Sequence, residues 1–438
     1  MKLTATGDLL PTHPFAARAE PGFREVLATV GEADVALTNL ECPVFDGRGY
    51  PAAQSGGIWP YAGAWAGADL AGCGFHMVGL ANNHMMDFVD GGLAATCASL
   101  DRAGLPWAGA GRDLGEARRP AYREFRVGRV AMVAATSTFP ALARAGAARH
   151  DFTGRPGVNP LRLRASYAAP GEVVTALEEL ARRYHLAGAP GRIPGEVAAA
   201  GAAACWFAGH HIHVGSLGEV TSSPHPDDLA GNLAAVREAA RQADWVMVQI
   251  HSHDALPDRD RPPAGLRAFC HACIDAGAHA VIGHGPHCTR GIEIYRGWPI
   301  LYSLGDFLIQ NETTPTLPDD AYRIFNLGPD ATPADLFDAR SDRDRRGFPT
   351  DPLVWQTVLP LLTLGANGLE AMTLSPLTLG RTRRRTRRGL PEPAVGEEAE
   401  AIMARVVTLS AAFGTSLHRQ GGELVWVPTL AGRRASAE

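Results

Sequence analysis

The sequence predicts an α/β protein, because short apolar strands alternate with helical segments along most of its length. Several of these strands end in polar residues, a placement typical of α/β proteins that bind a ligand at one sheet edge. The chain has 438 residues, of which 46% are hydrophobic and 20% charged, values that suit one large or two globular domains.

The first third of the chain contains four predicted strands, each a short apolar run. The expected strands are residues 2–6, 34–38, 75–80 and 130–135. The expected helices between them are residues 21–30, 65–73 and 91–103. Gly104 ends the last of these helices. This alternation predicts βαβ units with parallel strands.

Residues of about 140–235 interrupt the alternation, because proline and glycine recur there. We expect an insertion that forms a cap over the sheet edge, with helices at 172–187 and 230–243. Insertions of this length in a compact domain are usually functional or mobile.

The alternation resumes after the insertion and then gives way to a C-terminal extension. The expected strands are residues 245–250, 280–282, 291–295 and 299–303, and the expected helix is 265–276. The extension predicts a hairpin of residues 353–364 and 369–379, a helix at 397–413 and a strand at 424–427. The expected division is a domain of residues 1–310 and an extension of residues 311–438 that completes the second sheet.

The composition excludes several classes of partner. A net charge of −5 does not predict the positively charged surface that binds nucleic acid. No apolar run approaches the ~20 residues of a membrane-spanning helix, and the N-terminus lacks the apolar segment of a signal peptide. Seven cysteines predict no disulfide framework, and Cys270 and Cys273 are interpreted as one packed helix face. We therefore expect a cytoplasmic protein without nucleic-acid or membrane partners.

Side chains with metal-binding chemistry follow five of the predicted strands. They are Asp8, then Asn39 and Glu41, then Asn83 and His84, then His251, and finally His284 and His287. Because parallel strands bring their carboxyl ends to one sheet edge, we expect these groups to meet. Carboxylate, carboxamide and imidazole ligands suit Mn, Fe or Zn, so the sequence predicts a divalent-metal site.

Six short motifs cover residues 1–310. They are GDLL at Gly7, NLE at Asn39, ANNHMMD at Ala81, IHSHD at Ile250, GHGPH at Gly283 and YSLGDF at Tyr302. Together they resemble the CapA family of poly-γ-glutamate capsule synthesis proteins, within the calcineurin-like metallophosphoesterase superfamily. LSPLTLG at Leu374 and LSAAFGT at Leu409 are similar to one soluble branch of that family. The resemblance implies a four-layer α/β/β/α sandwich of the metallophosphatase type with a metal site at one sheet edge.

The resemblance also implies roles for individual residues. The expected metal ligands are Asp8, Glu41, Asn83, His251, His284 and His287. The expected catalytic residues are His84, His287 and Asp8. Residues expected to support the ligands or to contact substrate are Asn39, Asn82, Asp87, His253, Asp254, Arg290 and Asp306.

The sequence departs from the superfamily pattern at two metal-binding motifs. Leu10 stands at the third position of the first motif, D-x-H, and two residues rather than one separate His284 from His287. One metal position therefore loses a ligand, which argues against a two-metal phosphatase mechanism. The expected cofactor is one or two divalent ions per chain, with Mn, Fe, Zn and Ca as candidates.

The resemblance predicts a metal-dependent enzyme that acts on a peptide or γ-glutamyl amide substrate by hydrolysis or transfer. His84 or His287 would serve as general acid or base at a carbonyl that the metal polarises. The alternative reaction is epimerisation of a peptide residue, in which Asp8 and His287 remove and return a Cα proton. Phosphate-ester hydrolysis and a non-catalytic part in capsule synthesis are further alternatives.

Three arginines and an asparagine supply candidate contacts for a substrate carboxylate, because arginine presents a planar pair of donors. The candidates are Arg155, Asn159, Arg162 and Arg290, with loop salt bridges as the alternative interpretation. The charged stretches at 335–346 and 381–388 are interpreted as solvated loops. For the second, which holds six arginines, a local anion site is the alternative.

Overall fold

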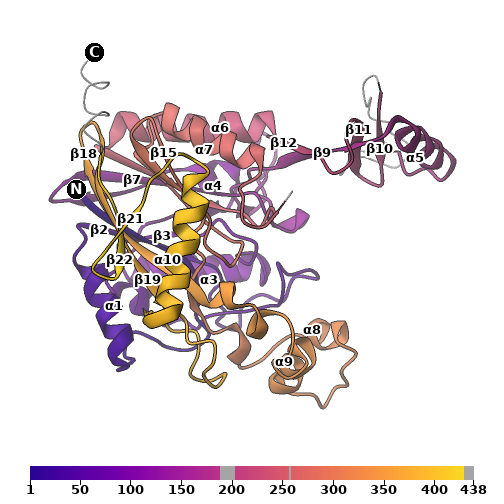
Figure 1. Ribbon diagram of the computed structural model, residues 1–438. Coiled ribbons are helices and arrows are strands. Elements are labelled where there is room, and N and C mark those ends of the chain that lie inside the picture. Colours follow the sequence, from indigo (N-terminus) through magenta and orange to yellow (C-terminus); the bar gives the residue numbers. More distant parts are fainter. Residues whose placement is uncertain (188–202, 256–257, 429–438) are drawn as a thin grey trace.

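The computed structural model describes residues 1–187, 203–255 and 258–428, and it confirms the predicted α/β class. Within this part of the chain the strands form sheets of ten, six, four and two strands. Figure 1 shows a body built on the larger sheets and an arm that projects from it. Residues 188–202 of the expected insertion lie outside the described residues.

The ten-stranded sheet is organised around β1 (Lys2–Leu10), in which every residue after Lys2 is buried. β1 pairs in parallel with β2 (Val35–Leu40) and β17 (Asp306–Ile309), and antiparallel with β18 (Gln356–Gly365). The main order is β21-β22-β19-β18-β1-β2-β3-β4. The remaining strands are β3 (Met77–Gly79), β4 (Trp107–Ala108), β19 (Gly368–Thr378), β20 (Glu392–Pro393), β21 (His418–Gln420) and β22 (Glu423–Trp426).

The six-stranded sheet carries the predicted second group of parallel strands. β13 (Trp245–His251) lies between β7 (Gly128–Thr136) and β14 (Ala280–His284), and all three run parallel. The register aligns His251 with His284 at the carboxyl ends. The other strands are β6 (Ala121–Phe125), β15 (Ile292–Tyr295) and β16 (Trp298–Leu301).

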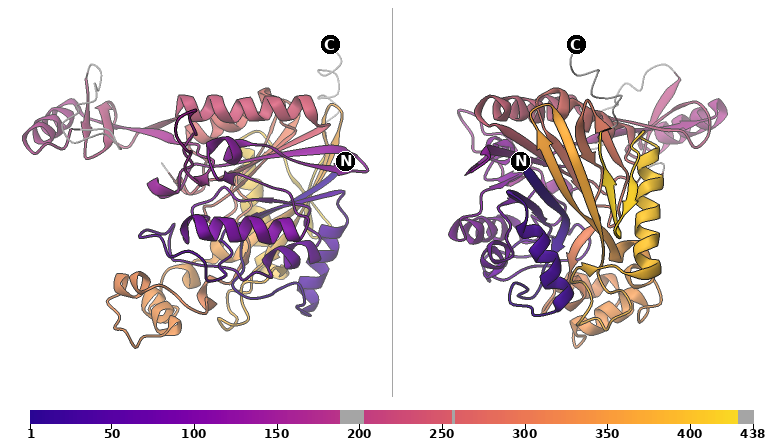
Figure 2. Two further views of the ribbon diagram at one scale, coloured as in Figure 1. Left: turned by 180° about the vertical axis from the view of Figure 1, so that it is seen from behind. Right: turned by 60° about the vertical axis from the view of Figure 1, so that its left-hand side comes forward.

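Three hydrophobic clusters hold the body together. The first joins side chains of the two large sheets, such as Leu3 and Met132, with residues of α10 (Gly396–Ala411). The second packs the ten-stranded sheet against three helices, which are α1 (Pro21–Gly31), α2 (Ala66–Gly72) and α3 (Val89–Arg102). The third packs the six-stranded sheet against α6 (Pro226–Gln242) and α7 (Ala264–Asp275). Figure 2 shows α6 and α3 on opposite sides of the strands.

The arm consists of a small sheet with its own helix and its own core. Its elements are β9 (Leu163–Ala169), α5 (Gly171–Arg183), β10 (Ala204–Phe207), β11 (His210–Val214) and β12 (Val220–Pro224). The arm extends away from the body in Figures 1 and 2. The expected insertion of about 140–235 includes the first part of α6, a helix that packs on the six-stranded sheet of the body. A short helix, α4 (Leu114–Arg118), and the pair β5 (Ala110–Gly111) and β8 (Gly157–Val158) also belong to the body.

The C-terminal extension joins the same sheet as β1. Its strands β18 to β22 all lie in the ten-stranded sheet, and Leu377 shares a core cluster with Phe307 and Leu308. Before these strands, α8 (Asp319–Ile324) and α9 (Pro333–Ser341) form a lobe. The expectation of a solvated loop at 335–346 is wrong over α9, whose first turn is closed by a capping box between Thr332 and Asp335. None of the helices described here has the length and apolarity needed to cross a membrane.

Candidate metal centre

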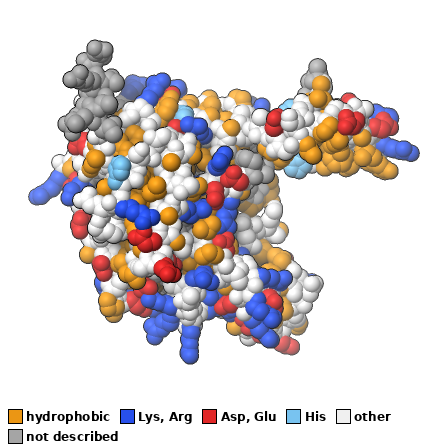
Figure 3. All heavy atoms as spheres, viewed as in Figure 1, with side chains coloured by type: hydrophobic (Ala, Val, Ile, Leu, Met, Phe, Trp, Pro, Cys, Tyr) orange, Lys and Arg blue, Asp and Glu red, His pale blue; other side chains and the backbone are white. Residues whose placement is uncertain are grey.

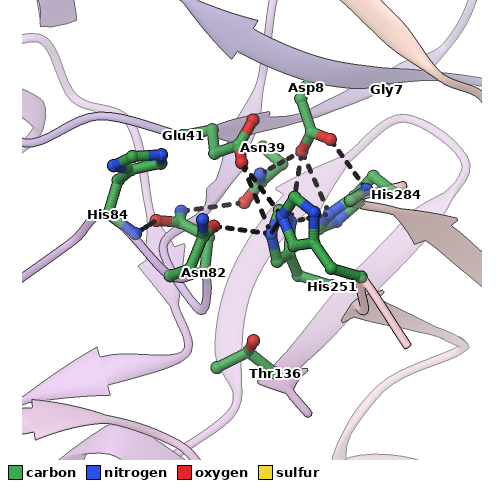
Figure 4. Close-up of polar contacts among 12 residues, drawn as sticks. Gly7, Asp8, Asn39, Glu41, Asn82, His84, Thr136, His251 and His284 are labelled. Atoms are coloured by element: carbon green, nitrogen blue, oxygen red, sulfur yellow. Dashed lines mark hydrogen bonds and ion pairs between the residues drawn. The ribbon is translucent and has the colours of Figure 1, made fainter. Parts of the chain in front are cut away.

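The strand ends of the two large sheets meet in one buried cluster. Asp8 lies near the end of β1, Glu41 follows β2, and His251 and His284 end β13 and β14. Figure 4 shows these four side chains pointing toward one another. Each is at most 1% exposed. The structure thus brings together residues that are far apart in the sequence, as the strand-end pattern predicts.

Asp8 is held at the centre of the cluster by several polar groups. Asn39 donates a hydrogen bond from Nδ2 to Asp8 Oδ1 at 2.6 Å, and the Gly285 N–H donates to Oδ2 at 2.8 Å. The Nδ1 atoms of His251 and His284 each lie 3.3 Å from Oδ1. Burial alone would raise the pKa of Asp8, but the two imidazoles hold it well below its ordinary value.

The Glu41 carboxylate, unlike that of Asp8, accepts no hydrogen bonds from the described residues. Its Oε1 lies 3.4 Å from His251 Nε2 and 3.6 Å from His253 Nε2. Burial, followed by the negative charge of Asp8, raises the pKa of Glu41 well above its ordinary value. Because buried polar atoms in folded proteins are nearly always paired, these oxygens fit a bound cation.

The histidines face one another through their ring nitrogens. His251 Nδ1 lies 3.0 Å from His284 Nδ1, and His251 Nε2 lies 3.0 Å from His253 Nε2. His251 Nε2 also lies 2.8 Å from the amide oxygen of Asn83. Burial lowers the pKa of His251 to about 4, so its ring is neutral near pH 7. Neutral imidazoles present the lone pairs that a divalent metal requires.

The loop after β3 carries Asn82, Asn83 and His84. Asn82 holds this loop, because its Nδ2 donates to the Leu40 carbonyl at 2.8 Å and its Oδ1 accepts from His84 N–H at 3.1 Å. His84 Nδ1 lies 2.7 Å from Asp87 Oδ2, a pair that fixes the imidazole ring. In Figure 4 His84 lies to one side of Asp8 and His251. This placement suits proton transfer better than metal binding.

His287 and Asp306 form the other acid–base pair of the site. His287 Nδ1 lies 2.8 Å from Asp306 Oδ1, whereas Asp306 Oδ2 is buried without a hydrogen-bond partner in the described chain. Burial opposes the charged imidazole, but Asp306 raises the pKa of His287 above its ordinary value. His287 has a φ of 51°, a left-handed conformation that is uncommon for histidine. Strain of this kind concentrates at functional sites.

Three overlapping groups of ligand atoms could hold a metal, each with its atoms within 4.8 Å of one another. The groups are Asp8, His251 and His284; Glu41, His251 and His253; and Asp8, Glu41, His287 and Asp306. Four unpartnered buried atoms belong to their members, namely both Glu41 oxygens, Asp306 Oδ2 and His284 Nε2. The donor set mixes oxygen and nitrogen, so the residues present fit a divalent ion. His253 and Asp306, expected to support the ligands or to contact substrate, thus also supply potential ligand atoms.

Leu10 and Arg290 make contacts within the fold. Leu10, at the third position of the D-x-H motif, packs with Ile309 and Trp355 in a hydrophobic cluster. Arg290 is 1% exposed and donates to the backbone carbonyls of Arg259 at 2.9 Å and Asp254 at 2.6 Å. Arg290 therefore holds the chain after β13, and its Nη1 atom is buried without a hydrogen-bond partner among the described residues.

The remaining candidate carboxylate contacts also have internal partners. Arg162 makes hydrogen bonds of 2.7 and 2.9 Å with Asp228, and Arg155 donates to the Arg144 carbonyl at 2.9 Å. Asn159 donates to Asn232 at 2.7 Å inside the body. Arg162 thus forms a salt bridge of the kind that the alternative interpretation expects, whereas Arg155 and Asn159 form hydrogen bonds to uncharged groups.

Comparisons with known proteins show the family to which the chain is similar. Residues 2–311 match the family model described as bacterial capsule synthesis protein PGA_cap. The uncharacterized protein y4sH of Sinorhizobium fredii is 31% identical over 428 residues, which cover 95% of this chain and 90% of that protein. The probable polyglutamine synthesis accessory protein MT0602 of Mycobacterium tuberculosis is 33% identical over 238 residues, 53% of this chain and 44% of that protein. PGA biosynthesis protein CapA of Bacillus subtilis is 33% identical over 148 residues, 32% of this chain and 37% of that protein.

Proposed function

The chain belongs to the bacterial capsule synthesis protein family PGA_cap, and from this premise we propose that it is a divalent-metal-dependent enzyme that hydrolyses or transfers a peptide or γ-glutamyl amide bond. One observation carries the proposal: buried ligand atoms of Glu41, His284 and Asp306 without partners belong to one cluster at the strand ends. The same premise supports a four-layer arrangement of the metallophosphatase type, in which helices flank two facing sheets.

The proposed substrate class rests on the names of the relatives. Two of them are named for PGA biosynthesis and polyglutamine synthesis, and polymers of such residues are joined by amide bonds. An amide carbonyl is a weak electrophile, so its cleavage benefits from a cation and from a group that protonates the leaving amine. The site offers residues for both tasks.

Each part of the cluster has a distinct task in the proposed reaction. Asp8, His251 and His284 would hold one divalent ion, which when bound polarises a carbonyl and lowers the pKa of water. His287 keeps Nδ1 on Asp306 and is placed to donate a proton from Nε2 to the leaving amine. Asp306 raises the pKa of His287 above its ordinary value, which favours the protonated form of the ring. Both oxygens of Asp8 accept hydrogen bonds, which suits a ligand better than a proton carrier.

The test combines metal analysis with a reaction in deuterated water. The purified protein, loaded in turn with Mn, Fe, Zn and Ca, is incubated with γ-glutamyl peptides and with a phosphate ester. We expect a bound divalent ion and amide cleavage without deuterium at Cα. Deuterium at Cα without cleavage would identify the epimerisation alternative, and cleavage of the ester alone would identify a phosphoesterase. Absence of bound metal under all four conditions would overturn the proposal.

A further inference from the structure

The metal centre is most open to solvent on the side of His253 and His287. Their side chains are 25% and 16% exposed, whereas those of Asp8, Glu41 and His251 are 0% exposed. A substrate must therefore reach the cluster past these two histidines.

Phe348 contacts His287 at this opening and also lines a cavity. Its ring packs edge-on against His287, with ring centroids 5.0 Å apart. Phe348 also lines a cavity of about 250 Å³, whose other walls include Asn311, Arg340 and Arg346. The cavity is thus adjacent to the histidine that is placed to protonate the leaving group.

Arg340 brings a positive charge to this cavity from the last turn of α9. Its guanidinium lies over the Phe348 ring, 5.6 Å from the ring centroid, in a cation–π arrangement. The charge is close enough to lower the pKa of His287. The half-buried Arg340 side chain forms no ion pair and donates no hydrogen bond within the described chain.

The acidic residues around Arg340 form their hydrogen bonds with other arginines, and the charge of one of them, Glu312, also acts on Arg340. Glu312, which lines the same cavity, makes two hydrogen bonds of 2.6 Å with Arg388. Asp338 accepts from Arg385 at 2.8 Å, and Asp344 accepts from Arg388 at 3.0 Å. Arg346 adds a second positive charge to the cavity wall, because its guanidinium binds only backbone carbonyls of α9 in the described residues. The cavity wall therefore carries two arginines, Arg340 and Arg346, against one carboxylate, Glu312, to which Arg388 is already hydrogen-bonded.

We infer that Arg340 and this cavity form an anion subsite that binds a substrate carboxylate next to the bond that reacts. The inference rests on the proposed function and narrows its substrate to acidic γ-glutamyl peptides. In a γ-linked chain each residue keeps a free α-carboxylate, and a planar guanidinium binds such a group with two parallel hydrogen bonds. The Phe348 ring packs against the guanidinium, whose nitrogens donate no hydrogen bond within the described chain.

The test compares an acidic γ-glutamyl tripeptide with the same peptide amidated at its α-carboxylates, using the metal-loaded full chain. KM and kcat are measured for the parent, Arg340→Gln, Arg340→Lys and the control Arg343→Gln. Arg343 is an exposed arginine on the same segment, so its substitution removes the same charge outside the cavity. Binding of both peptides is also measured by calorimetry.

We expect Arg340→Gln to raise KM and Kd for the acidic peptide about ten- to hundredfold, the range of a charged hydrogen-bonded pair, with kcat little changed. The KM and Kd of Arg340→Lys for the acidic peptide should lie between those of the parent and of Arg340→Gln. Arg343→Gln should match the parent. Equal affinity of the parent for both peptides, or unchanged binding in Arg340→Gln, would overturn the subsite. Cleavage of neither peptide by a parent that binds the acidic one through Arg340 would overturn the proposed reaction instead.

Discussion

The charged carboxylate of Glu41 lowers the stability of the metal-free fold, because it is buried, but it is the form that would bind a metal. Its pKa is higher in the folded protein than in the unfolded chain, so the folded state binds more protons. The stability of the metal-free protein should therefore fall as pH rises above the ordinary glutamate value of about 4.3. A bound cation would remove this loss, because it stabilises the charged carboxylate.

Glu41→Gln tests this balance at nearly constant shape. The metal-free variant should be more stable than the parent at pH 8, by roughly 1–3 kcal/mol for a buried polar group that loses an unpaired charge. It should also lose most of the affinity for metal. Chemical denaturation with chelator at pH 5 to 8 and calorimetric metal titration measure both effects, and the exposed Glu25→Gln serves as control. Equal metal affinity in Glu41→Gln would contradict the assignment of Glu41 as a ligand.

His251 is the imidazole shared by two of the three ligand groups. His251→Ala should therefore lower metal affinity by more than about a hundredfold, a larger loss than removal of an outer partner of a ligand causes. His287→Ala belongs to one group only and should retain more metal while losing activity. Metal content after dialysis and amide cleavage report these effects. The exposed His150→Ala is the control, and it should match the parent in both measurements. A metal-replete His251→Ala would be incompatible with this centre.

The meeting of the polar side chains near the strand ends could be predicted from the sequence, because each follows an apolar run that forms a parallel strand. Asp8, Glu41 and His251 are brought together in this way, and their role as metal ligands stays a prediction. Phe348 and Arg340 could not be, since only the three-dimensional packing of the C-terminal lobe brings them to His287. The roles of His253 and Asp306 depend on distances of a few ångströms, which strand order alone does not give.

At the scale of elements, the close contact of β1 with the turn before β17 sets the position of Asp8 and Asp306. The Asp8 N–H donates to the Gly305 carbonyl at 3.0 Å, and a Cβ on Gly7 would overlap that carbonyl oxygen. The Asp8–Asp306 register follows directly after this contact. The first metal-binding motif therefore requires glycine at position 7 for steric reasons.

Gly7→Ala should force β1 and the Gly305 turn apart. Insertion of one methyl group into a packed site costs about 1–3 kcal/mol, and here it also displaces two carboxylates of the metal centre. We expect lower stability in denaturant unfolding and weaker metal binding in the same sample. Gly31→Ala, at the end of α1 with open space around the new Cβ, should change neither. Parent-like metal binding by Gly7→Ala would show that this contact does not position the ligands.

The elements that the sequence failed to predict were short or strongly charged. β17 has four residues and gains its place by pairing with β1, a contact between distant parts of the chain. α9 was expected to be a loop because of its charges. A signal was nevertheless present, since Thr332 and Asp335 have the spacing of a capping box and Pro333 suits the first helical position.

At the scale of the whole molecule, the candidate metal centre lies where the strands of both large sheets end, so its geometry depends on the entire body. The arm differs, because its small core of Ala169, Val174 and Cys205 is separate from the three clusters of the body. The arm and the body should therefore contribute separately to stability.

Removal of the outer arm tests this independence. Tyr167 and Val220 are directly paired across the antiparallel strands β9 and β12, so an Asn-Gly turn can replace residues 168–219 and close a hairpin. Every residue of the arm core is lost in this deletion, whereas β12 keeps the hydrogen bond from Gly265 N–H to Ser222 at 2.9 Å.

We expect the shortened protein to melt within about 5 °C of the parent, since the deletion removes no side chain of the body clusters. Metal affinity should be unchanged. Asp228→Asn is the contrasting variant, because buried Asp228 binds Arg162 and Arg118 at the base of the arm. Loss of a buried charged partner costs about 3–5 kcal/mol, so this single substitution should destabilise the protein more than the deletion does. Calorimetric melting of both variants decides the point, and a deletion that melts lower than Asp228→Asn or loses the metal would mean that the arm is part of the core fold.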